Sequence, residues 1–332
     1  MFDRIFIEQE VKDLPATEKI LRTFPDLPIT EIDQVDKVFG QVKKPYLQKR
    51  ETLNLFLGKK RGQLVKEAPE AYGAAGAPHY YFVHAYNCIY ECQYCYLQGY
   101  FHSPDIVLFL NHAEIAEEIH RVADQHPDQT VWFHAGEFSD SLALSHLSGE
   151  LDFYFDCFKK RPTAKLELRT KSANIRELLK LEPAPNIITS FSLSPDKASK
   201  HFDLKTPPLK ARLAAMKALS DAGHPLAIHL DPIIYQPNFI EAYDQMLSQL
   251  TNQIDLNRIQ YISLGVVRFT KDVYREVRNN YPQTSEFRGN FKTSFDGKVR
   301  YDRPTRMYIL NQVKALCSKY GASEDQIYLC ME

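Results

Sequence analysis

The chain has 332 residues, of which 44% are hydrophobic and 25% are charged, and its formal net charge is −1. This composition is typical of a globular protein, and the length is sufficient to bury one large core. The nearly neutral charge excludes the global basic field of many nucleic-acid binders. The charged start, Met1–Glu8, does not fit a signal peptide, and no apolar run approaches the about 18 residues of a membrane span. We therefore expect a cytoplasmic protein without a membrane segment.

Residues 1–78 are predicted to form an N-terminal α/β extension. Its strand candidates are Arg4–Glu8 and Pro28–Ile32, and its helix candidates are Thr17–Thr23 and Ile32–Phe39. A basic stretch ends this extension, and it contains Lys43, Lys44, Lys49, Arg50, Lys59, Lys60, Arg61 and Lys66 against the single acid Glu51. Both a phosphate-binding rim and a solvated face fit such a stretch.

Residues 79–302 alternate between short apolar strands and helices, which indicates a parallel sheet covered on both faces. The strand candidates are His79–His84, Ile106–Leu110, Thr130–His134, Lys165–Thr170, Ile187–Leu193, Pro225–His229 and Tyr261–Gly265. The helix candidates are Ala113–Asp124, Leu142–Lys159, Ile175–Leu181, Pro208–Ala222, Ile240–Leu250 and Lys271–Arg278. Six or seven such units predict a full or partial (β/α) barrel, with its chemistry at the carboxyl ends of the strands. Residues 303–332 add a helix (Thr305–Lys319) and a strand (Gln326–Cys330) that close the barrel.

Three cysteines, Cys88, Cys92 and Cys95, follow the first predicted core strand with the spacing C-x3-C-x2-C. Three thiolates on one loop can hold three irons of a [4Fe–4S] cluster, whereas an electron-transfer cluster normally takes four cysteines. The fourth iron is then open to a small molecule, as at other catalytic metals. Zinc bound by these cysteines and a histidine such as His84 is an alternative, although structural zinc usually pairs two ligand knuckles. Plain buried thiols are the third interpretation.

This loop, with Tyr94 before its third cysteine, resembles the radical S-adenosylmethionine (radical SAM) superfamily. The continuation Cys95-Tyr-Leu-Gln98 is similar to the spore photoproduct lyase family, whose members repair DNA photoproducts. Further similar segments follow in order, and they are Phe133-His-Ala-Gly-Glu-Phe-Ser-Asp140, Arg169-Thr-Lys171, Phe191-Ser-Leu-Ser194 and Arg268-Phe-Thr270. The resemblance covers about residues 50 to 302 and implies a partial (β/α)6 TIM-type radical SAM barrel.

The resemblance also implies cofactors and site residues. Cys88, Cys92 and Cys95 match the ligands of the [4Fe–4S] cluster. The positions that contact S-adenosylmethionine (SAM) are matched by Ser139, Lys171 and Ser192. Tyr96 matches a catalytic tyrosine beside the hydrogen-transfer site, and the lesion-binding residues correspond to Arg300 and Tyr301. The implied reaction is reductive SAM cleavage, hydrogen abstraction from DNA or a nucleobase substrate, and C–C bond cleavage, with a flavodoxin- or ferredoxin-type electron donor.

Glu137 departs from the family pattern, because it stands where the lyases carry the cysteine that returns a hydrogen atom to the product radical. A carboxylate that is ionised at neutral pH cannot do so. Ala135-Gly-Glu137 instead resembles a Gly-Gly-Glu element of the superfamily, whose acid binds the SAM ammonium group. Asp140 is the better candidate to cap the following helix. Cys330 is a replacement donor if its strand reaches the barrel mouth.

Most of these residues also have a structural interpretation. Lys171 fits a solvated lysine, Ser139 and Ser192 fit hydroxyls that satisfy the backbone, and Tyr96 fits a packed tyrosine. His229 and Asp231, at another predicted strand end, fit residues that line the barrel mouth, and they also fit a satisfied core histidine and a helix-capping aspartate. Buried packing is expected for Cys157 and Cys317, and for most aromatic residues near the loop, which are Tyr80, Tyr81, Phe82, Tyr86, Tyr90, Tyr94 and Tyr100.

Three hypotheses for the function follow. The first is a spore photoproduct lyase-like enzyme, the second a radical SAM enzyme for a small molecule or a peptide, and the third a non-catalytic nucleic-acid-binding protein that holds zinc or a cluster.

Overall fold

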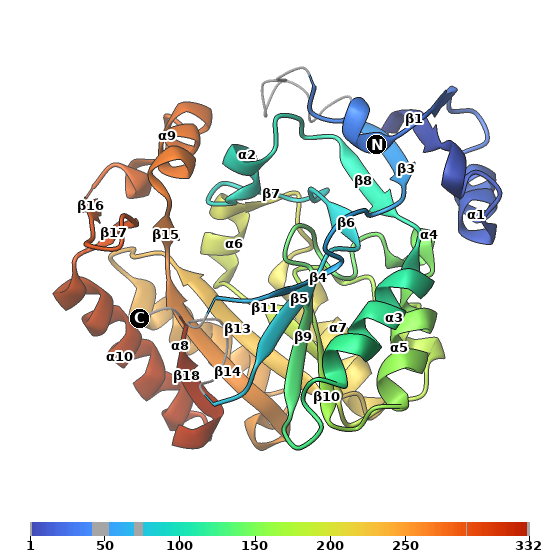
Figure 1. The fold of residues 1–332 in the computed structure, drawn as a ribbon. Coiled ribbons are helices and arrows are strands. Elements are labelled where there is room, and N and C mark those ends of the chain that lie inside the picture. Colours follow the sequence, from blue (N-terminus) through green and yellow to red (C-terminus); the bar gives the residue numbers. More distant parts are fainter. Residues whose placement is uncertain (1, 42–52, 70–75, 290, 331–332) are drawn as a thin grey trace.

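Two large sheets organise residues 2–41, 53–69, 76–289 and 291–330, which the computed structural model describes. The larger sheet, central in Figure 1, has the strand order β18-β14-β13-β11-β10-β9-β5-β4. Its strands are β4 (Val65–Glu67), β5 (His79–Phe82), β9 (Val131–Ala135), β10 (Ala164–Thr170), β11 (Ile187–Ser192), β13 (Leu226–Ile233), β14 (Ile259–Val266) and β18 (Ile327–Leu329).

Six of these strands, from β5 to β14, pair in chain order and in parallel. The helices that connect or cover them are α3 (His112–Ala123), α5 (Glu150–Lys159), α6 (Asp196–Phe202), α7 (Leu209–Asp221) and α8 (Phe239–Thr251). β18 extends the sheet in parallel beside β14, and β4 pairs antiparallel with β5. Among the described residues β4 and β18 do not pair with each other, so the barrel stays open. The predicted partial (β/α)6 barrel is thereby confirmed.

The second sheet has the order β2-β1-β3-β8-β6 and lies at the upper right of Figure 1. Its strands are β1 (Phe2–Glu8), β2 (Ile29–Ile32), β3 (Leu53–Gly58), β6 (Ala85–Tyr86) and β8 (Ile106–Phe109), and α1 (Pro15–Thr23) packs beside it. We expected the run Ile106–Leu110 among the barrel strands, and that placement is wrong. The run is apolar at every position because its two faces enter two different hydrophobic clusters, so composition alone does not tell the two sheets apart.

Three predicted helices are shorter than expected. The candidates Ile32–Phe39 and Ile175–Leu181 form only single 3₁₀ turns. The candidate Leu142–Lys159 divides into α4 (Ser145–Ser148) and α5, because Gly149 adopts a φ of 72°. That left-handed conformation ends a helix and is easily accessible only to glycine.

The C-terminal part adds a small antiparallel sheet that the sequence did not predict. Its strands are β15 (Arg268–Phe269), β16 (Phe291–Thr293) and β17 (Val299–Tyr301), in the order β15-β17-β16. α9 (Lys271–Asn280) follows β15, and α10 (Arg303–Lys319) packs against β14 and α8. Across the described residues, we find no helix with the length and apolarity that a membrane crossing requires.

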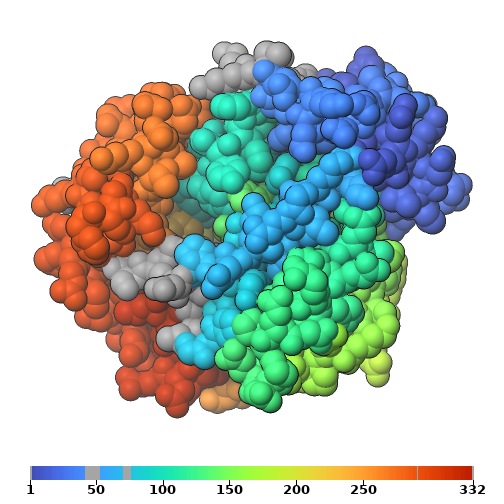
Figure 2. Space-filling model, in the orientation of Figure 1, coloured from blue at the N-terminus to red at the C-terminus, as the bar shows by residue number. Residues whose placement is uncertain are grey.

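The two faces of the barrel sheet differ in polarity. The face toward the helices is apolar and forms the largest hydrophobic cluster. The inner face carries charged, hydroxyl and imidazole side chains, which are described below. In the space-filling view of Figure 2, the light-blue segment that contains β4 crosses the molecule between the green helix α3 and the orange and red C-terminal part.

Candidate active site

The cysteine loop lies where the two large sheets meet. β5 ends in the barrel sheet at Phe82, and the next strand, β6, already belongs to the N-terminal sheet. The loop then contains β7 (Glu91–Cys92), which pairs with β12 (Asp203–Leu204), and ends in α2 (Leu97–Tyr100). Figure 1 shows β7 and α2 above the barrel sheet, between the N-terminal sheet and α9. This is the edge where (β/α) barrels carry their chemistry.

Hydrogen bonds fix the start of the loop. Asn87 has a φ of 60°, a left-handed conformation that asparagine tolerates better than most residues. Its buried amide Nδ2 donates to the carbonyl oxygens of Ser103 and Asp105, at 2.7 Å each. One turn later, the backbone N–H of Tyr90 donates to Cys88 Sγ at 3.4 Å.

Two glutamine side chains tie the loop to distant segments. Gln93 donates through Nε2 to the carbonyl of His201 at 2.7 Å and accepts from Thr284 Oγ1 at 2.6 Å. Gln98 donates to the carbonyl of Gln93 at 3.0 Å and accepts from Asn280 Nδ2 at 2.7 Å. Residues about α9 therefore hold the cysteine loop from the side opposite the N-terminal sheet.

The donor set fits an iron–sulfur cluster better than a single metal ion. Cys88, Cys92 and Cys95 are soft ligands, and none of them is in a disulfide. Among the described residues no three His, Cys, Asp or Glu side chains converge on one ion position. A cubane needs no such convergence, because each iron takes one thiolate. His84, the fourth ligand in the zinc alternative, is buried with its Nδ1 at 3.9 Å from Glu150.

Lys171 faces the cysteine loop from the end of β10. Its Nζ lies 5.5 Å from the centroid of the Tyr94 ring. Burial raises the pKa of the Cys92 thiol to about 12, and the positive charge of Lys171 opposes this rise. The backbone N–H of Lys171 donates to Asp140 Oδ2 at 2.7 Å, which holds the position of the residue.

A buried ion pair supports the aromatic residue of the loop. The Tyr94 hydroxyl donates to Asp203, and Asp203 Oδ2 lies 3.4 Å from Arg212 Nη2. Both side chains of this pair are completely buried, so each charge depends on the other. Arg212 also donates to the carbonyl of Ser192 at 3.0 Å. The end of β11, where we predicted a SAM contact, is thereby linked to the cysteine loop.

The segment after β9 brings Glu137 to the same edge. Gly136 has a φ of 89°, and a Cβ there would lie 2.6 Å from Ser141 Oγ, so this turn requires glycine. The Tyr96 hydroxyl donates to the carbonyl of Glu137, while the Tyr96 side chain remains 39% exposed. Ser139 donates its backbone N–H to the Gly136 carbonyl at 3.4 Å. Glu137, Ser139 and Tyr96 are therefore neighbours.

Asp140 caps the turn before α4, whereas the predicted helix cap is wrong, because α4 begins only at Ser145 and its N-cap residue, Leu144, makes no side-chain cap bond. Asp140 Oδ1 accepts from the backbone N–H groups of Leu142 at 3.0 Å and Ala143 at 2.9 Å. The same oxygen accepts from Thr170 Oγ1 at 2.7 Å, which ties the turn to the end of β10. Asp140 thus joins the segments that carry Glu137 and Lys171.

The inner face of the barrel carries a buried polar network that our sequence analysis missed. Glu167 on β10 is its centre, and its carboxylate contacts side chains from four strands, which are His134, Ser190, His229 and Tyr261. Burial by itself would raise the pKa of Glu167, but Arg169 and the two histidines hold that pKa well below its usual range. The alternation in Lys165-Leu-Glu-Leu-Arg169 was the available signal, because every second residue of a strand points to the same face.

An ion pair and a thiol lie near the carboxyl edge of the same sheet. Asp231 on β13 binds Arg268 through two contacts, at 3.0 and 3.2 Å. The expectation that Asp231 caps a helix is therefore wrong. Arg268 Nη2 also donates to Cys330 Sγ at 3.7 Å. His229 is a fully buried core histidine, as its structural interpretation predicted.

Two cations in the described part of the basic stretch, Lys59 and Arg61, form ion pairs. Lys59 Nζ lies 2.7 Å from Glu114 Oε1, and Arg61 Nη2 lies 2.6 Å from Glu10 Oε1. Arg61 also binds Glu8, whose side chain is completely buried. These pairs favour a structural role over a phosphate-binding rim. The cations Lys43, Lys44, Lys49 and Arg50 lie outside the described residues.

Arg300 and Tyr301 lie inside the small C-terminal sheet. Their exposed fractions are 5% and 4%. Arg300 Nη2 is paired with Asp296 Oδ2 at 3.1 Å, and the Tyr301 hydroxyl accepts from the backbone N–H of Tyr235 at 3.3 Å. Cys157 and Cys317 are 2% and 0% exposed in α5 and α10, which confirms the packing that we predicted for them.

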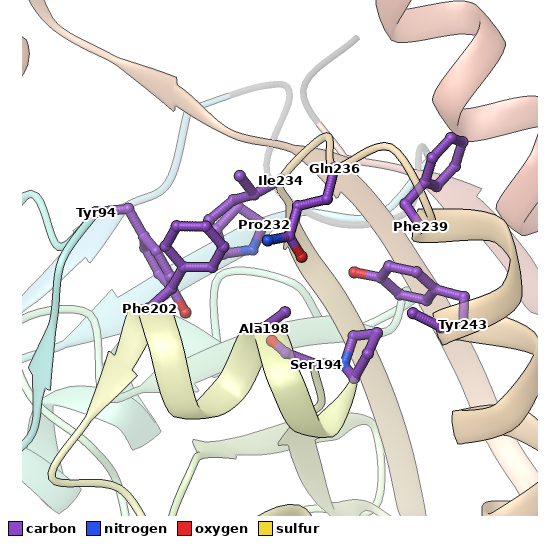
Figure 3. A pocket seen from close by; sticks show the side chains of 11 residues that line it. Tyr94, Ser194, Ala198, Phe202, Pro232, Ile234, Gln236, Phe239 and Tyr243 are labelled. Atoms are coloured by element: carbon purple, nitrogen blue, oxygen red, sulfur yellow. The ribbon is translucent and has the colours of Figure 1, made fainter. Parts of the chain in front are cut away.

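A pocket opens next to Tyr94, between α6 and α8. In Figure 3 the rings of Tyr94 and Phe202 lie together on one side and Tyr243 on the other. Ser194 after β11 and Ile234 after β13 contribute to its wall. The lining is largely apolar, and the pocket continues into a surface groove along α6 and α8.

Comparisons with known proteins find relatives that are similar in sequence. The chain is 28% identical over 203 residues to the spore photoproduct lyase of Bacillus subtilis (strain 168), which covers 60% of this chain and 59% of that protein. The chain thus spans about three-fifths of the length of that relative in the match. It is 22% identical over 291 residues to the spore photoproduct lyase of Clostridium acetobutylicum, which covers 86% of this chain and 84% of that protein.

Solved structures share the fold. A spore photoproduct lyase double mutant with bound AdoMet and dinucleoside spore photoproduct superimposes with a TM-score of 0.84 at 20% identity, covering 99% of this chain and 98% of that chain. A spore photoproduct lyase complexed with dinucleoside spore photoproduct gives a TM-score of 0.82 at 20% identity, with the same coverage. The family model described as spore photoproduct lyase matches residues 2–320. The chain therefore belongs to the spore photoproduct lyase family.

Proposed function

We propose that this chain is a radical SAM enzyme of the lyase type, whose Cys88, Cys92 and Cys95 hold a [4Fe–4S] cluster. The observation that carries the proposal is the three-thiol loop at the carboxyl edge of an open parallel barrel, in a member of the spore photoproduct lyase family. A cluster held by these three thiols would supply the chemistry of reductive SAM cleavage, which leads to hydrogen abstraction from the substrate. A flavodoxin- or ferredoxin-type protein is the proposed electron donor.

The residues around the loop have separate tasks in this proposal. Cys88, Cys92 and Cys95 would hold the cluster and would leave it open to a small molecule such as SAM. Lys171 binds the SAM carboxylate and Glu137 binds the SAM ammonium group, each by a charge-assisted hydrogen bond. Ser139 and Ser192 add neutral hydrogen bonds. The tight turn at Gly136 and the cap at Asp140 hold these groups in position.

The proposed substrate is a DNA photoproduct or a related nucleobase compound, broken at a C–C bond. A relative in a solved structure binds dinucleoside spore photoproduct. Tyr96 and Tyr100, with exposed fractions of 39% and 57%, present aromatic faces next to the cysteine loop. Stacking of a base on such a face contributes about 1–3 kcal/mol. Because Glu137 stands at the donor position, a radical SAM enzyme for a small molecule or peptide is the second candidate.

We also propose a division of the chain into an N-terminal extension (1–78), the radical SAM barrel (79–302) and a closing segment (303–332). The barrel sheet and the small C-terminal sheet support the barrel segment, residues 79–302. Two strands of that segment, β6 and β8, nevertheless pair in the N-terminal sheet. A cytoplasmic location belongs to the same proposal, because six thiols without a disulfide and an oxygen-sensitive cluster suit a reducing compartment.

Anaerobic reconstitution with iron and sulfide tests the proposal. The protein should acquire a visible iron–sulfur absorption and should form 5′-deoxyadenosine from SAM under a strong reductant. With dinucleoside spore photoproduct that carries deuterium at the abstracted position, deuterium should enter 5′-deoxyadenosine, and thymine dinucleoside should be released.

The possible results separate the hypotheses. SAM cleavage without deuterium transfer would favour the small-molecule or peptide substrate. Protein that takes up zinc in place of a cluster and leaves SAM intact would contradict the radical chemistry.

A further inference from the structure

We propose that Cys330 is the hydrogen-atom donor that quenches the product radical in this chain. The inference rests on the proposed function, because it concerns the carbon radical that remains after hydrogen abstraction and C–C cleavage. Such a radical becomes a stable product by taking a hydrogen atom. A thiol is suited to this step, because its S–H bond is weaker than the C–H bond that forms.

The distribution of thiols singles out Cys330. The chain has six cysteines, and three of them form the cysteine loop. Cys157 lies in α5 with its Sγ 3.7 Å from the carbonyl of Ala116 in the outer helix layer, and Cys317 is completely buried in α10. Cys330 remains, and it is the thiol that lies at the end of a barrel strand.

Backbone register puts Cys330 at the edge where the cysteine loop lies. Its N–H donates to the carbonyl of Leu264 at 2.8 Å, which continues the parallel ladder between β18 and β14. Tyr328 pairs with Ser263 on the inner face, and Cys330 is two residues further on, so it points to the same face. At the adjacent position of β14, Gly265 leaves room for the Asp231 carboxylate, because a Cβ there would lie 2.5 Å from Asp231 Oδ1.

The surroundings keep the thiol in its protonated form. The side chain is 5% exposed, and the nearby Asp231 carboxylate favours the protonated thiol, whereas Arg268, which donates to the sulfur, opposes this effect. Burial raises the pKa of Cys330 to about 11. At neutral pH the sulfur therefore carries the hydrogen that the reaction needs.

A buried polar atom in the layer beneath Cys330 points to a guest molecule. His229 Nδ1 has no hydrogen-bond partner among the described residues, and His229 is 0% exposed. His229 pairs with Ser263, which in turn pairs with Tyr328, two residues before Cys330. Because buried polar atoms are nearly always satisfied, a polar group of a bound molecule or its water is expected there.

The step balances with a one-electron donor. The S–H bond of Cys330 breaks homolytically, and the hydrogen atom forms a C–H bond on the product. The thiyl radical that remains takes one electron from the low-potential donor that also reduces the enzyme, and one proton from water. The thiol is thereby restored, and no other oxidant or reductant is required.

Turnover in D₂O tests the inference, because a thiol exchanges its hydrogen with water. We expect the reconstituted wild-type protein to place one solvent deuterium in each product of dinucleoside spore photoproduct. In Cys330→Ala and in the isosteric Cys330→Ser, deuterated product per 5′-deoxyadenosine should fall by about tenfold or more, as for loss of a group used in the reacting step. The matched control, Cys317→Ala, should behave as the wild type.

A second measurement needs no cofactor. In the cluster-free protein, dinucleoside spore photoproduct should slow the alkylation of Cys330 by iodoacetamide, followed by mass spectrometry, and should leave Cys317 unaffected. Unchanged deuterium incorporation in Cys330→Ser, or a Cys330 that the photoproduct does not protect, would overturn this inference alone. A wild-type protein that makes no 5′-deoxyadenosine would overturn the proposed function and this inference with it.

Discussion

Lys171 and Glu137 are held in different ways, although we assign both to SAM. The backbone of Lys171 is fixed by Asp140, and its ammonium group lies beside the Tyr94 ring. Glu137 is fixed through its carbonyl, which accepts from Tyr96, so its carboxylate is oriented less directly. Lys171 is therefore the sharper test of the SAM site.

We expect Lys171→Met to weaken SAM binding by about tenfold or more, because a hydrogen bond to a charged group contributes about 1.5–3 kcal/mol. Isothermal titration of SAM to the reconstituted protein measures the change. The control is Lys180→Met, which removes an exposed lysine paired with Glu177. Equal affinities in both variants would contradict the assignment of Lys171.

Glu150 gives the chain a pH dependence that is independent of the cluster. It is buried in α5 and accepts from Ser148, and burial raises its pKa to about 7. The folded state thus favours the protonated acid, so the stability that this group contributes is full below the unfolded pKa of about 4.5 and is lost as pH rises through about 7. Burial lowers the pKa of the neighbouring His84 to about 4, so this imidazole stays neutral across that window.

Glu150→Gln should remove this dependence. Relative to the wild type, its free energy of unfolding at pH 8 should increase by up to about 3 kcal/mol, while little should change near pH 4.5. Urea unfolding of the two proteins at both pH values measures the effect. A variant that is destabilised equally at both values would show that Glu150 does not titrate in this range.

At the scale of elements, the contact between α2 and α9 controls the cysteine loop. Gly99 in α2 lies so close to α9 that a Cβ there would be 3.0 Å from Val273 Cγ2 and 3.2 Å from Val273 Cα. The same two elements share the hydrogen bond between Gln98 and Asn280. A shift of α9 therefore moves the helix that directly follows Cys95.

We expect Gly99→Ala to lower the free energy of unfolding by about 1–3 kcal/mol, the usual cost of overpacking. The displaced loop should also bind less iron after reconstitution, which a colorimetric iron assay measures. Gly289→Ala is the matched control, because no atom lies within 4 Å of a Cβ at that glycine. Full iron content in Gly99→Ala would show that the loop tolerates the shift.

At the scale of the whole molecule, the C-terminal segment is part of the barrel. β18 pairs with β14, and α10 buries Ile309, Leu310 and Val313 against the same core. The first turn of α10 is capped by Asp302, which accepts from the backbone N–H of Thr305 at 3.0 Å. A chain without this segment would expose one edge and one face of the sheet to water.

Truncation after residue 302 should therefore abolish cooperative unfolding. The removed helix buries several aliphatic side chains, and each of these contributes about 1.5–3 kcal/mol, which together approaches the entire stability of a domain. Circular dichroism during thermal unfolding and size-exclusion chromatography measure the outcome. A monomeric truncated chain with a sharp transition would support a separate closing segment.

Prediction from the sequence succeeded where the signal was local. The barrel strands appeared as apolar runs, and Cys88, Cys92 and Cys95 are close in the chain. Prediction failed where the outcome depended on which strands pair or on which face a side chain points to. The strand β8 joins the other sheet, Asp231 meets Arg268 across 37 residues, and Glu167 lies among apolar neighbours in the chain but faces imidazoles in the barrel.

The sequence by itself determined the class of fold and the three-thiol loop, because strand periodicity and ligand spacing depend on residues within one turn or one strand. Only the tertiary structure decided that residues near 280 hold this loop, that an acid and its partners fill the barrel, and that the last cysteine lies at the barrel edge. These relations join positions far apart in the chain. They depend on strand order and register, which the local pattern of hydrophobic residues does not encode.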